Sequence, residues 1–249
     1  MLSELSDALL RLDPSLLLMD LGFDPEPFQV ELLRSKAERI LLLTHRQAGK
    51  STATAALGIG TALREPGSLI LIVSRSQNQA DELFRKLSHF YKVLGEPMAT
   101  VEDNAHTLAL ENNSRIVSLP HSPSTIVGYS GPGLIILDEA ARVSDETYLS
   151  VSPMLLRSRG KLVAMSTPLG RRGWFSDAWH DTSADWHRIA YKASENPRLD
   201  REYLAEERRR LGDRWYMQDY ENSFEDAVGQ VFSSESILAA FTSAEEPLF

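Results

Sequence analysis

Cysteine, long apolar runs and an excess of positive charge are all missing from this sequence of 249 residues. Without cysteine there is no disulfide framework, no thiolate metal site and no cysteine nucleophile. Because no apolar run approaches the ~18–20 residues that span a bilayer, no membrane-spanning segment is predicted. Glu4 and Asp7 stand where a secretory signal peptide would carry basic residues. These absences favour a globular protein of the cytosol.

The balance of charge bears on the kind of partner. Lys and Arg number 26 against 35 Asp and Glu, which gives a formal net charge of -9. Such a chain is not expected to hold nucleic acid tightly through its overall charge, although local basic patches can still contact it. The basic run Arg208–Arg210 follows two acids on a predicted helix and is interpreted as a solvated face. With 43% hydrophobic and 24% charged residues, the composition is that of an ordinary globular protein.

Short apolar runs alternate with amphipathic stretches along the chain. The runs are typical of strands buried on both faces, and they are Ile40–Leu43, Leu69–Val73, Leu134–Leu137 and Lys161–Ser166. A hairpin is predicted from Thr107–Leu110 and Arg115–Leu119, and a loop from Pro120 to Gly133. Helices are predicted at Phe28–Arg39, Ser51–Leu63, Gln77–Val93, Asp145–Leu155, Arg172–His180, Arg201–Leu211 and Arg214–Glu221. The alternation predicts an α/β fold with helices on both faces of a mostly parallel central sheet.

The segment from Thr44 to Thr52 lies between a predicted strand and a predicted helix, where a phosphate-binding loop belongs. The free N–H groups and the positive dipole end of the helix attract phosphate. Gly49 allows close backbone approach, Lys50 supplies a charge for the β- and γ-phosphates, and Ser51 supplies a hydroxyl for Mg²⁺. The predicted nucleotide-binding residues of the loop are Gln47, Ala48, Gly49, Lys50, Ser51 and Thr52. Thr44 replaces the first glycine of the usual pattern, and an ordinary helix start is the alternative interpretation.

Two carboxylates end the apolar run Leu134–Leu137. Asp138 and Glu139 are therefore expected at the carboxyl edge of the sheet, where open α/β sheets bind ligands. We predict that Asp138 holds Mg²⁺ together with Ser51, and that Glu139 polarises the attacking water as a general base. The alternative is that the two acids merely begin a helix, where negative charge suits the helix dipole. A phosphate loop upstream in the sequence makes this alternative less favoured.

Three further predictions rest on weaker signals. Ser166 and Thr167 end another apolar run, and their hydroxyls can hydrogen-bond the γ-phosphate or its water and report hydrolysis; a simple turn is the alternative. Gln29 on the first predicted helix can read both edges of an adenine as donor and acceptor, although a surface glutamine is the ordinary interpretation. Arg46 can reach the γ-phosphate and would then be catalytic, or it forms a structural ion pair.

Together these motifs resemble the ATPase domain of tailed-phage large terminases, from about Pro25 to about Phe232. The resemblance rests on the loop Arg46–Ser51, on Gly128–Ser130 leading into Leu134–Glu139, and on Ser166–Phe175, which matches the family's coupling region. Further matches are Phe28 and Gln29 at the adenine-reading position, Ser74–Ser76, Ala140–Val143, Tyr220–Phe224 and Val231–Ser233. Their order and spacing together make the resemblance specific.

The resemblance implies a P-loop NTPase core at residues 1–195, with a helical extension at 1–24, and a small helical linker subdomain and tail at 196–249 that lead towards a nuclease domain. It implies a motor that uses ATP and Mg²⁺ in the host cytoplasm to translocate double-stranded DNA into a procapsid. Its partners would be transiently bound DNA, further copies in a homo-oligomeric ring on a portal, and a small terminase subunit, with no membrane. We expect no nuclease activity from these 249 residues.

One position departs from the family pattern. Val127 stands where members often carry an arginine that acts on a neighbour's ATP, so no trans-acting arginine is assigned. Arg142 is a candidate, and weaker ones are Arg157, Arg159, Arg171 and Arg172. Two other interpretations stay open. A helicase-like or remodelling ATPase on the same core would separate strands, and a non-catalytic nucleotide-binding assembly module would bind Mg-ATP without hydrolysing it.

Overall fold

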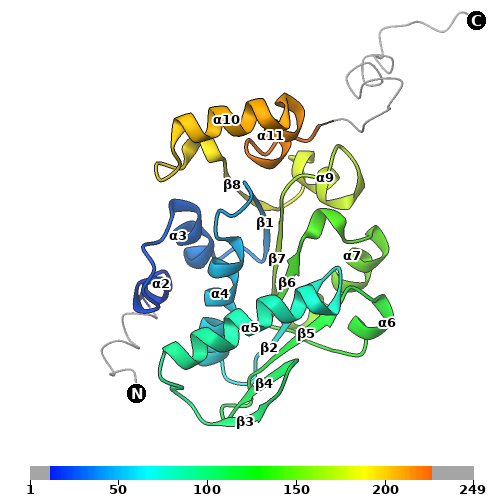
Figure 1. Cartoon of the computed structure of the whole chain (residues 1–249). Helices are drawn as coiled ribbons and strands as arrows, with labels where there is room; N and C mark the ends of the chain where they lie inside the picture. The colour runs from blue at the N-terminus through cyan, green and yellow to red at the C-terminus, as the bar shows by residue number, and fades with distance from the viewer. Residues whose placement is uncertain (1–11, 226–249) are drawn as a thin grey trace, which may run out of the picture.

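The fold is described for residues 12–225 of a computed structural model, and residues 1–11 and 226–249 lie outside that description. Within the described part, the centre is an eight-stranded sheet with the strand order β3-β4-β5-β2-β6-β7-β1-β8 (Figure 1). The predicted helical extension at 1–24 is described only from residue 12 onward. The predicted match at Val231–Ser233 lies outside the described residues.

Most of the sheet is parallel. The strands are β1 (Arg39–Thr44), β2 (Leu69–Ser74), β3 (Thr100–Asp103), β4 (Thr107–Leu110), β5 (Arg115–Pro120), β6 (Leu134–Asp138), β7 (Lys161–Ser166) and β8 (His187–Tyr191). From β5 to β8 every neighbouring pair is parallel. The antiparallel pairs in the described residues are β3 with β4 and β4 with β5. The predicted α/β class with a mostly parallel sheet is confirmed.

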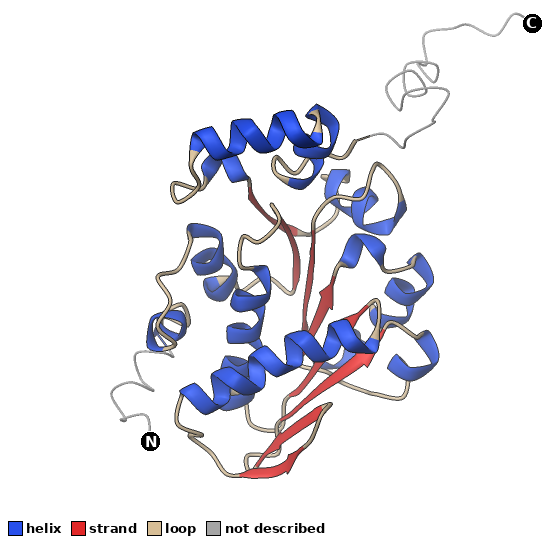
Figure 2. Ribbon diagram, viewed as in Figure 1, coloured by secondary structure: helices blue, strands red, loops and turns tan. Residues whose placement is uncertain are grey.

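Helices cover both faces of this sheet (Figure 2). They are α2 (Leu16–Asp20), α3 (Pro27–Arg34), α4 (Lys50–Arg64), α5 (Gln77–Val93), α6 (Pro123–Ile126), α7 (Asp145–Val151), α8 (Met154–Ser158), α9 (Gly173–His180), α10 (Arg201–Leu211) and α11 (Asp213–Asp219), with short 3₁₀ turns η1 (Ala140–Arg142) and η2 (Ala193–Glu195). Buried residues of α2 to α5 share one apolar cluster with the sheet, and those of α6, α7, α8 and α9 share another. None of the helices in residues 12–225 is long and apolar enough to cross a bilayer.

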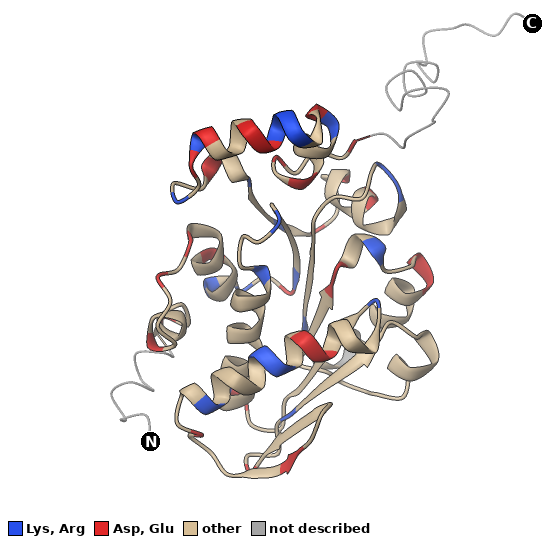
Figure 3. Cartoon of the chain, viewed as in Figure 1, with Lys and Arg blue, Asp and Glu red and all other residues tan. Residues whose placement is uncertain are grey.

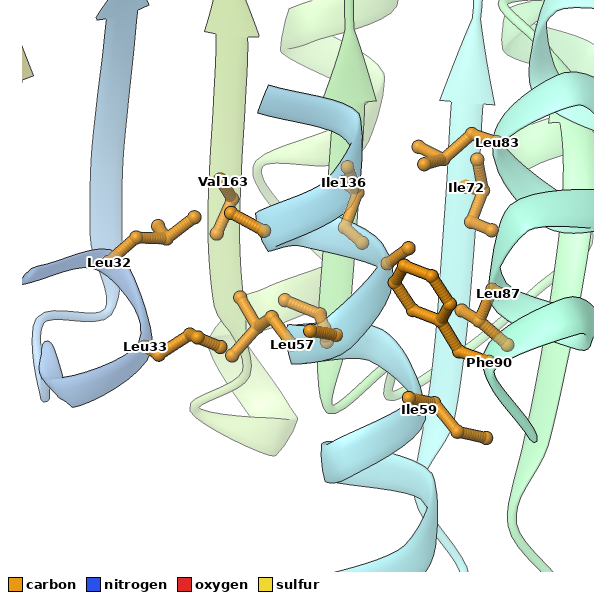
Figure 4. Packing of buried hydrophobic residues seen from close by; sticks show 14 of the residues in the cluster. Leu32, Leu33, Leu57, Ile59, Ile72, Leu83, Leu87, Phe90, Ile136 and Val163 are labelled. Atoms are coloured by element: carbon orange, nitrogen blue, oxygen red, sulfur yellow. The ribbon is translucent and has the colours of Figure 1, made fainter. Parts of the chain in front are cut away.

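The alternation of side chains along each strand explains why the core has two halves. In β1, Ile40 and Leu42 belong to the cluster under α2 to α5, whereas Leu41 and Leu43 belong to the cluster on the opposite face. Successive side chains of a strand point to opposite faces of the sheet, so a strand buried on both faces must be apolar throughout. Figure 4 shows the first cluster, where α3, α4 and α5 pack on β2, β6 and β7.

The C-terminal helices form a small unit of their own. Leu204 of α10 and Tyr216 of α11 pack with Ala193 in a third apolar cluster. The chain is tied back to the sheet by Asn222, whose Nδ2 donates to the carbonyl oxygens of Leu43 (3.2 Å) and Tyr191 (3.0 Å). These two carbonyls lie at the ends of β1 and β8, so the helical unit is held over the carboxyl edge of the sheet.

The structure corrects several predicted elements. The first predicted helix ends at Arg34 because Ser35 turns to an extended conformation. The predicted helix Asp145–Leu155 is divided into α7 and α8, with Pro153 at the start of the second. The predicted loop Pro120–Gly133 contains the short helix α6, which begins with a proline at its first turn. Strands β3 and β8 were missed, since β3 is exposed along its whole length, β8 is buried only in part, and neither has a continuous apolar run.

Candidate active site

A polar cleft of about 1000 Å³ opens at the carboxyl edge of the sheet. Its floor is formed where the neighbouring strands β6, β7 and β1 end. The residues that line it and that sequence analysis also predicts are Arg46, Gln47, Ala48, Gly49, Lys50, Ser51, Thr52, Asp138, Glu139 and Thr167. Three segments far apart in the sequence therefore meet at one place, as expected when parallel strands end side by side.

The loop between β1 and α4 is shaped by two residues with positive φ. Gln47 has φ 60 and Gly49 has φ 94, and Gly49 is the N-cap of α4. A Cβ on Gly49 would lie 2.8 Å from Nε2 of Gln29, so both the backbone angle and the space require glycine here. Because α4 begins at Lys50, its first backbone N–H groups have no partner within the helix and face the cleft as donors for an anion.

Lys50 lies half-buried at the base of this loop. Its Nζ donates to Thr44 Oγ1 at 3.3 Å and to the carbonyl oxygens of Thr44 (3.5 Å) and His45 (3.4 Å). Burial lowers the pKa of Lys50, while the nearby carboxylates of Glu139 and Asp138 act to raise it. A cation that is poorly solvated and held by long hydrogen bonds is well placed to bind phosphate oxygens.

The two carboxylates at the end of β6, Asp138 and Glu139, differ in their surroundings. Burial, and then repulsion from Glu139, raise the pKa of Asp138 to about 6. Asp138 Oδ1 accepts a hydrogen bond from the backbone N–H of Glu139 at 3.0 Å. Glu139 has φ 51, a strained angle for a residue other than glycine, and its Oε2 accepts from Nη1 of Arg142 at 2.7 Å. The pair therefore carries an incompletely balanced negative charge at the edge of the cleft.

Asp138 and Ser51 have the chemistry of a magnesium site. Mg²⁺ prefers oxygen ligands and is usually held by one or two carboxylates together with substrate phosphates and water. Asp138 is a half-buried carboxylate whose pKa is raised by desolvation and by the neighbouring Glu139, and the Ser51 hydroxyl lines the same cleft. In residues 12–225 no cluster of three or more acidic, histidine or cysteine ligands occurs, so a cation here would depend on the phosphates for its remaining ligands.

Ser166 and Thr167 lie at the end of β7, beside these carboxylates. Thr167 lines the cleft. Ser166 is fully buried, and its Oγ accepts a hydrogen bond from the backbone N–H of Ala141 at 3.3 Å. The end of β7 is thereby linked to the η1 turn that follows Glu139. This contact gives the predicted coupling residues a physical connection to the turn that follows Glu139, the predicted general base.

Two predicted site residues are engaged elsewhere. Gln29 is only 6% exposed, and it lies behind the loop, where its Nε2 donates to the carbonyl oxygen of Gly49 (3.2 Å) and its Oε1 accepts from the N–H of Glu26 (2.9 Å). Arg46 lines the cleft, but its Nη1 pairs with Asp219 Oδ2 of α11 at 3.3 Å. The structural ion pair considered for Arg46 is thus present. The adenine-reading role of Gln29 stays a prediction that this geometry does not favour.

One wall of the cleft was not predicted from the sequence. It consists of residues from the C-terminal helices and the segment before them, together with Lys86 of α5: Lys86, Asn196, Leu199, Tyr203, Glu207, Arg210 and Tyr220. Figure 3 shows acidic and basic segments interleaved along α10, in agreement with the ion pairs of Arg208 with Asp213 and of Arg210 with Glu207. The alternating charges suggested a solvated face, and nothing in the local pattern shows that Glu207 and Arg210 face a cleft.

His45 connects the loop to this wall. Its Nδ1 donates to the carbonyl oxygen of Arg46 at 2.7 Å, and its Nε2 lies 3.5 Å from Nδ2 of Asn196, an obligate donor. The ring therefore fits as the neutral tautomer with the proton on Nδ1. Burial lowers the pKa of His45, and the positive charge of Lys50 lowers it further. A protonated His45 would oppose the Asn196 amide group.

The position expected to carry a trans-acting arginine is at the surface. Val127 follows α6 and is 63% exposed. Of the candidates to replace it, Arg142 pairs with Glu139 of its own chain, and Arg171 donates through Nε to the carbonyl oxygen of Phe224 at 3.3 Å. These contacts do not assign the role to either of them.

The parallel sheet and the loop–helix cleft at its carboxyl edge together define a P-loop NTPase. The chain belongs to the family described as terminase large subunit, T4likevirus-type, N-terminal, whose match runs over residues 41–238. The resemblance noted in the sequence is confirmed. Since the match covers both the phosphate loop and the C-terminal helices, the cleft lies inside the part that defines the family.

Individual relatives agree with this assignment. The chain is 28% identical over 239 residues to the large terminase subunit of Escherichia phage T5, which covers 90% of this chain and 53% of that protein. It is 27% identical over 174 residues to the large terminase subunit of Thermus phage G20c, covering 62% of this chain and 36% of the relative. The chain therefore spans about half, or less, of the length of the curated relatives it matches.

Solved structures show the same fold. The ATPase domain of the Thermus phage P74-26 large terminase superposes with a TM-score of 0.73 at 21% identity, covering 83% of this chain and 96% of that one. The large terminase of a thermophilic bacteriophage in complex with ADP gives a TM-score of 0.67 at 11% identity, covering 81% and 54%. At these identities the likeness establishes the fold, and the chemistry has to be argued from the residues of this chain.

Proposed function

We propose that this chain is the ATP-hydrolysing motor domain of a viral large terminase, which couples hydrolysis of Mg-ATP to translocation of double-stranded DNA into a procapsid. The observation that carries the proposal is the meeting of residues 46–52 with Asp138, Glu139 and Thr167 in one cleft. A phosphate loop, a pair of carboxylates and a hydroxyl-bearing strand end are the parts that phosphoryl transfer to water requires.

In the proposed reaction each part has one task. The N–H groups at the start of α4 and the Nζ of Lys50 bind the β- and γ-phosphate oxygens and stabilise the charge that develops on them. Glu139 orients the attacking water and accepts its proton. Ser51 and Asp138 would hold Mg²⁺, which when bound neutralises charge on the phosphates. Arg46 lies at the mouth of the loop, and it would have to leave Asp219 to reach a phosphate.

The link from Ser166 to Ala141 supports a coupling role for the end of β7. A change at Thr167 when the γ-phosphate leaves would be passed through Ser166 to the η1 turn, because the two segments share a hydrogen bond. DNA translocation also requires a contact with DNA that is released at each step. The net charge of -9 suits a domain that contacts DNA only locally and transiently, within a ring of copies on a portal and with a small terminase subunit as partner.

The assignment of Lys50 and Glu139 is tested by phosphate release from purified variants. We expect Lys50→Ala and Glu139→Gln each to lower turnover by about 100-fold or more, the usual scale for removing a main stabilising or acid–base group. Glu139→Gln should still bind ATP, since its charge is not needed for ground-state binding. Glu146→Gln on the exposed start of α7 is the matched control and should keep wild-type turnover. Turnover near wild type in either site variant would refute the mechanism.

The role of neighbouring copies is tested separately. We propose that specific activity rises with protein concentration, because Val127 leaves this chain without the usual trans-acting arginine and a neighbour would have to complete the site by another group. Phosphate release is measured over a dilution series, with and without double-stranded DNA. A specific activity that does not change with protein concentration would show that Arg46 and the other groups of one chain suffice for hydrolysis. Hydrolysis would then not require a ring of copies.

A further inference from the structure

A second pocket, of about 950 Å³, opens at the amino edge of the sheet, on the side away from the nucleotide cleft. It is lined where β6 and β7 begin, at Leu134 and Lys161, and where α3 and α4 end. Its charged lining residues are Asp13, Arg34, Lys36, Arg64, Glu65 and Lys161. Four cations thus face two acids, in a chain whose formal net charge is -9. The pocket is a local basic site on an acidic protein.

Two of these four cations have an ordinary structural role. Arg34 and Arg64 lie in the last turns of α3 and α4, where positive charge suits the negative end of the helix dipole. Arg34 also donates to Asp13, through Nε at 2.9 Å and through Nη2 at 2.6 Å. This pair neutralises one of the two acids of the pocket.

Lys36 and Lys161 lie outside the helices, so helix dipoles do not account for them. Neither takes part in a salt bridge within residues 12–225. The Nζ of Lys161 donates to the carbonyl oxygen of Ser35 at 2.5 Å, which is one acceptor for a group with three donors. Burial lowers the pKa of Lys161, although Glu65 acts to raise it. A partly desolvated ammonium group without a counter-ion is stabilised by an anion that enters the pocket.

The floor of the pocket is held in place before any ligand binds. Ser35, which accepts from Lys161, is fixed in turn by His187 of β8, whose Nδ1 lies 2.7 Å from Ser35 Oγ. The Nε2 of the same ring lies 2.8 Å from Oε1 of Glu31 on α3. The segment that carries Lys36 is therefore anchored to α3, β7 and β8, and little ordering is left to be done on binding.

The lining indicates a ligand that is recognised by its phosphates. No aromatic side chain of residues 12–225 lines the pocket, so it offers no stacking surface for a base. Cations continue along the same edge of the sheet outside the pocket. Arg39 begins β1, and its Nη1 donates at 3.5 Å to the carbonyl oxygen of Gly160, which lies between the exposed Arg159 and Lys161. A row of cations across neighbouring strands suits a polyanion with repeated phosphates better than one small anion.

Two elements connect this pocket to the nucleotide cleft. Helix α4 begins at Lys50 in the phosphate loop and ends at Arg64 in the pocket, and its 15 residues span about 22 Å. Strand β7 begins at Lys161 in the pocket and ends at Ser166, next to Thr167 of the cleft. A polyanion bound at the amino edge therefore contacts the far ends of elements that also build the nucleotide cleft.

We propose that the pocket at the amino edge binds the phosphate backbone of double-stranded DNA, with Lys36 and Lys161 contacting phosphate oxygens. The proposal rests on the proposed function, since it takes the translocated polymer as the polyanion. It names the surface by which a chain of net charge -9 makes a local and transient contact with DNA. Because phosphate contacts carry no sequence information, this binding should not depend on the DNA sequence.

The test measures fluorescence anisotropy of two duplexes of unrelated sequence, between about 50 and 200 mM salt. Lys36→Glu and Lys161→Met should each weaken binding of both duplexes by about ten-fold at the lowest salt, and reduce the salt slope of log K by about 1. Lys36→Arg should keep wild-type binding, because it keeps the charge. Arg209→Glu is the matched control for charge reversal, at an exposed position of α10 outside the pocket, and should change neither quantity. ATP turnover without DNA should stay at the wild-type level in all four variants.

Each outcome decides one point. Unchanged DNA affinity and salt slope in Lys36→Glu would overturn the proposal, as would an equal loss in Arg209→Glu or a wild-type protein that binds neither duplex. Since Lys36 is exposed, its variants decide the point even if Lys161→Met does not fold. Calorimetric binding of inorganic phosphate that Lys161→Met abolishes, with DNA binding unchanged, would show that the pocket takes a small anion instead. Wild-type protein that binds the duplexes but does not hydrolyse ATP would refute the proposed function, so the two failures are distinguishable.

Discussion

Replacing Gly49 with alanine isolates the demand that the phosphate loop makes on its backbone. The loop holds Gly49 at φ 94, and a Cβ there would lie 2.8 Å from Gln29 Nε2. A residue other than glycine in the left-handed region costs about 1–2 kcal/mol. The steric contact also forces Gln29 away from the Gly49 carbonyl oxygen it now contacts at 3.2 Å, and losing such a hydrogen bond costs about 1 kcal/mol. The expected loss of unfolding free energy is therefore about 2–3 kcal/mol.

The chain offers a control for the backbone part of this cost. Gly67 has φ 74, and nothing lies within 4 Å of the position of its Cβ, so Gly67→Ala should lose only about 1–2 kcal/mol. The two variants and wild type are compared by urea unfolding followed through tryptophan fluorescence, with equal m-values required. The difference between the variants then measures the contact with Gln29.

Two results would refute this reasoning. Equal destabilisation by Gly49→Ala and Gly67→Ala would mean that the Gln29 contact adds nothing. A Gly49→Ala protein as stable as wild type would mean that the left-handed backbone of the loop is not held in solution. As a further check, adding Gln29→Ala to Gly49→Ala removes the steric contact, so the two changes should be less than additive.

Three other changes have defined outcomes. Burial lowers the pKa of His45 from its ordinary value of 6.5, so as pH falls the unfolded chain binds the extra proton before the folded chain does. The stability that neutral His45 contributes is therefore complete above about pH 6.5 and is lost as pH falls below it, by at most about 1.4 kcal/mol per pH unit. His45→Gln should flatten this part of the stability profile between about pH 7 and 5, whereas the exposed His89→Gln should not. Asn222→Gly keeps the φ of 59 accessible but removes the donor to two strand-end carbonyls, so urea unfolding should show a loss of about 1–3 kcal/mol; an unchanged midpoint would refute the tie. Trp174→Phe removes the 3.0 Å bond from Nε1 to the carbonyl of Val143 while keeping a ring to stack on Tyr148, and thermal unfolding should shift down by several degrees if that bond stabilises the turn after Glu139.

The central sheet and the catalytic end of the cleft follow from local sequence. Wholly apolar runs such as Ile40–Leu43 leave no polar face for solvent, which identifies buried parallel strands, and the polar residues that follow them must then meet at the carboxyl edge. That reasoning placed Lys50, Asp138, Glu139 and Thr167 in one cleft without knowledge of the strand order. The edge strand β8 escaped because His187 and Arg188 interrupt its apolar pattern.

The opposite wall of the cleft could not be derived in this way. Its contacts join His45 to Asn196 and Arg46 to Asp219, and no periodicity within a segment reports a contact across so long a stretch of chain. Gln29 is the converse case. Its residue type suits adenine, but the hydrogen bond from its Nε2 to the carbonyl oxygen of Gly49 is a tertiary contact that no local pattern indicates. Functional residues at strand ends can be predicted from the sequence, whereas the packing of a C-terminal helix over an N-terminal loop cannot.

The position of β1 between β7 and β8 has a consequence for synthesis of the chain. β1 is the first of the described strands in the sequence, yet the two strands that pair with it, β7 and β8, are the last two in the sequence. At ribosomal rates, the interval before Lys161 emerges is on the order of ten seconds. During that time the apolar segment Ile40–Leu43 has no partner strand, and exposed unpaired strands of this kind invite association with other chains. Nascent-chain chaperones should therefore engage the region around β1, and the phosphate loop can take its final shape only when the last third of the domain has been made.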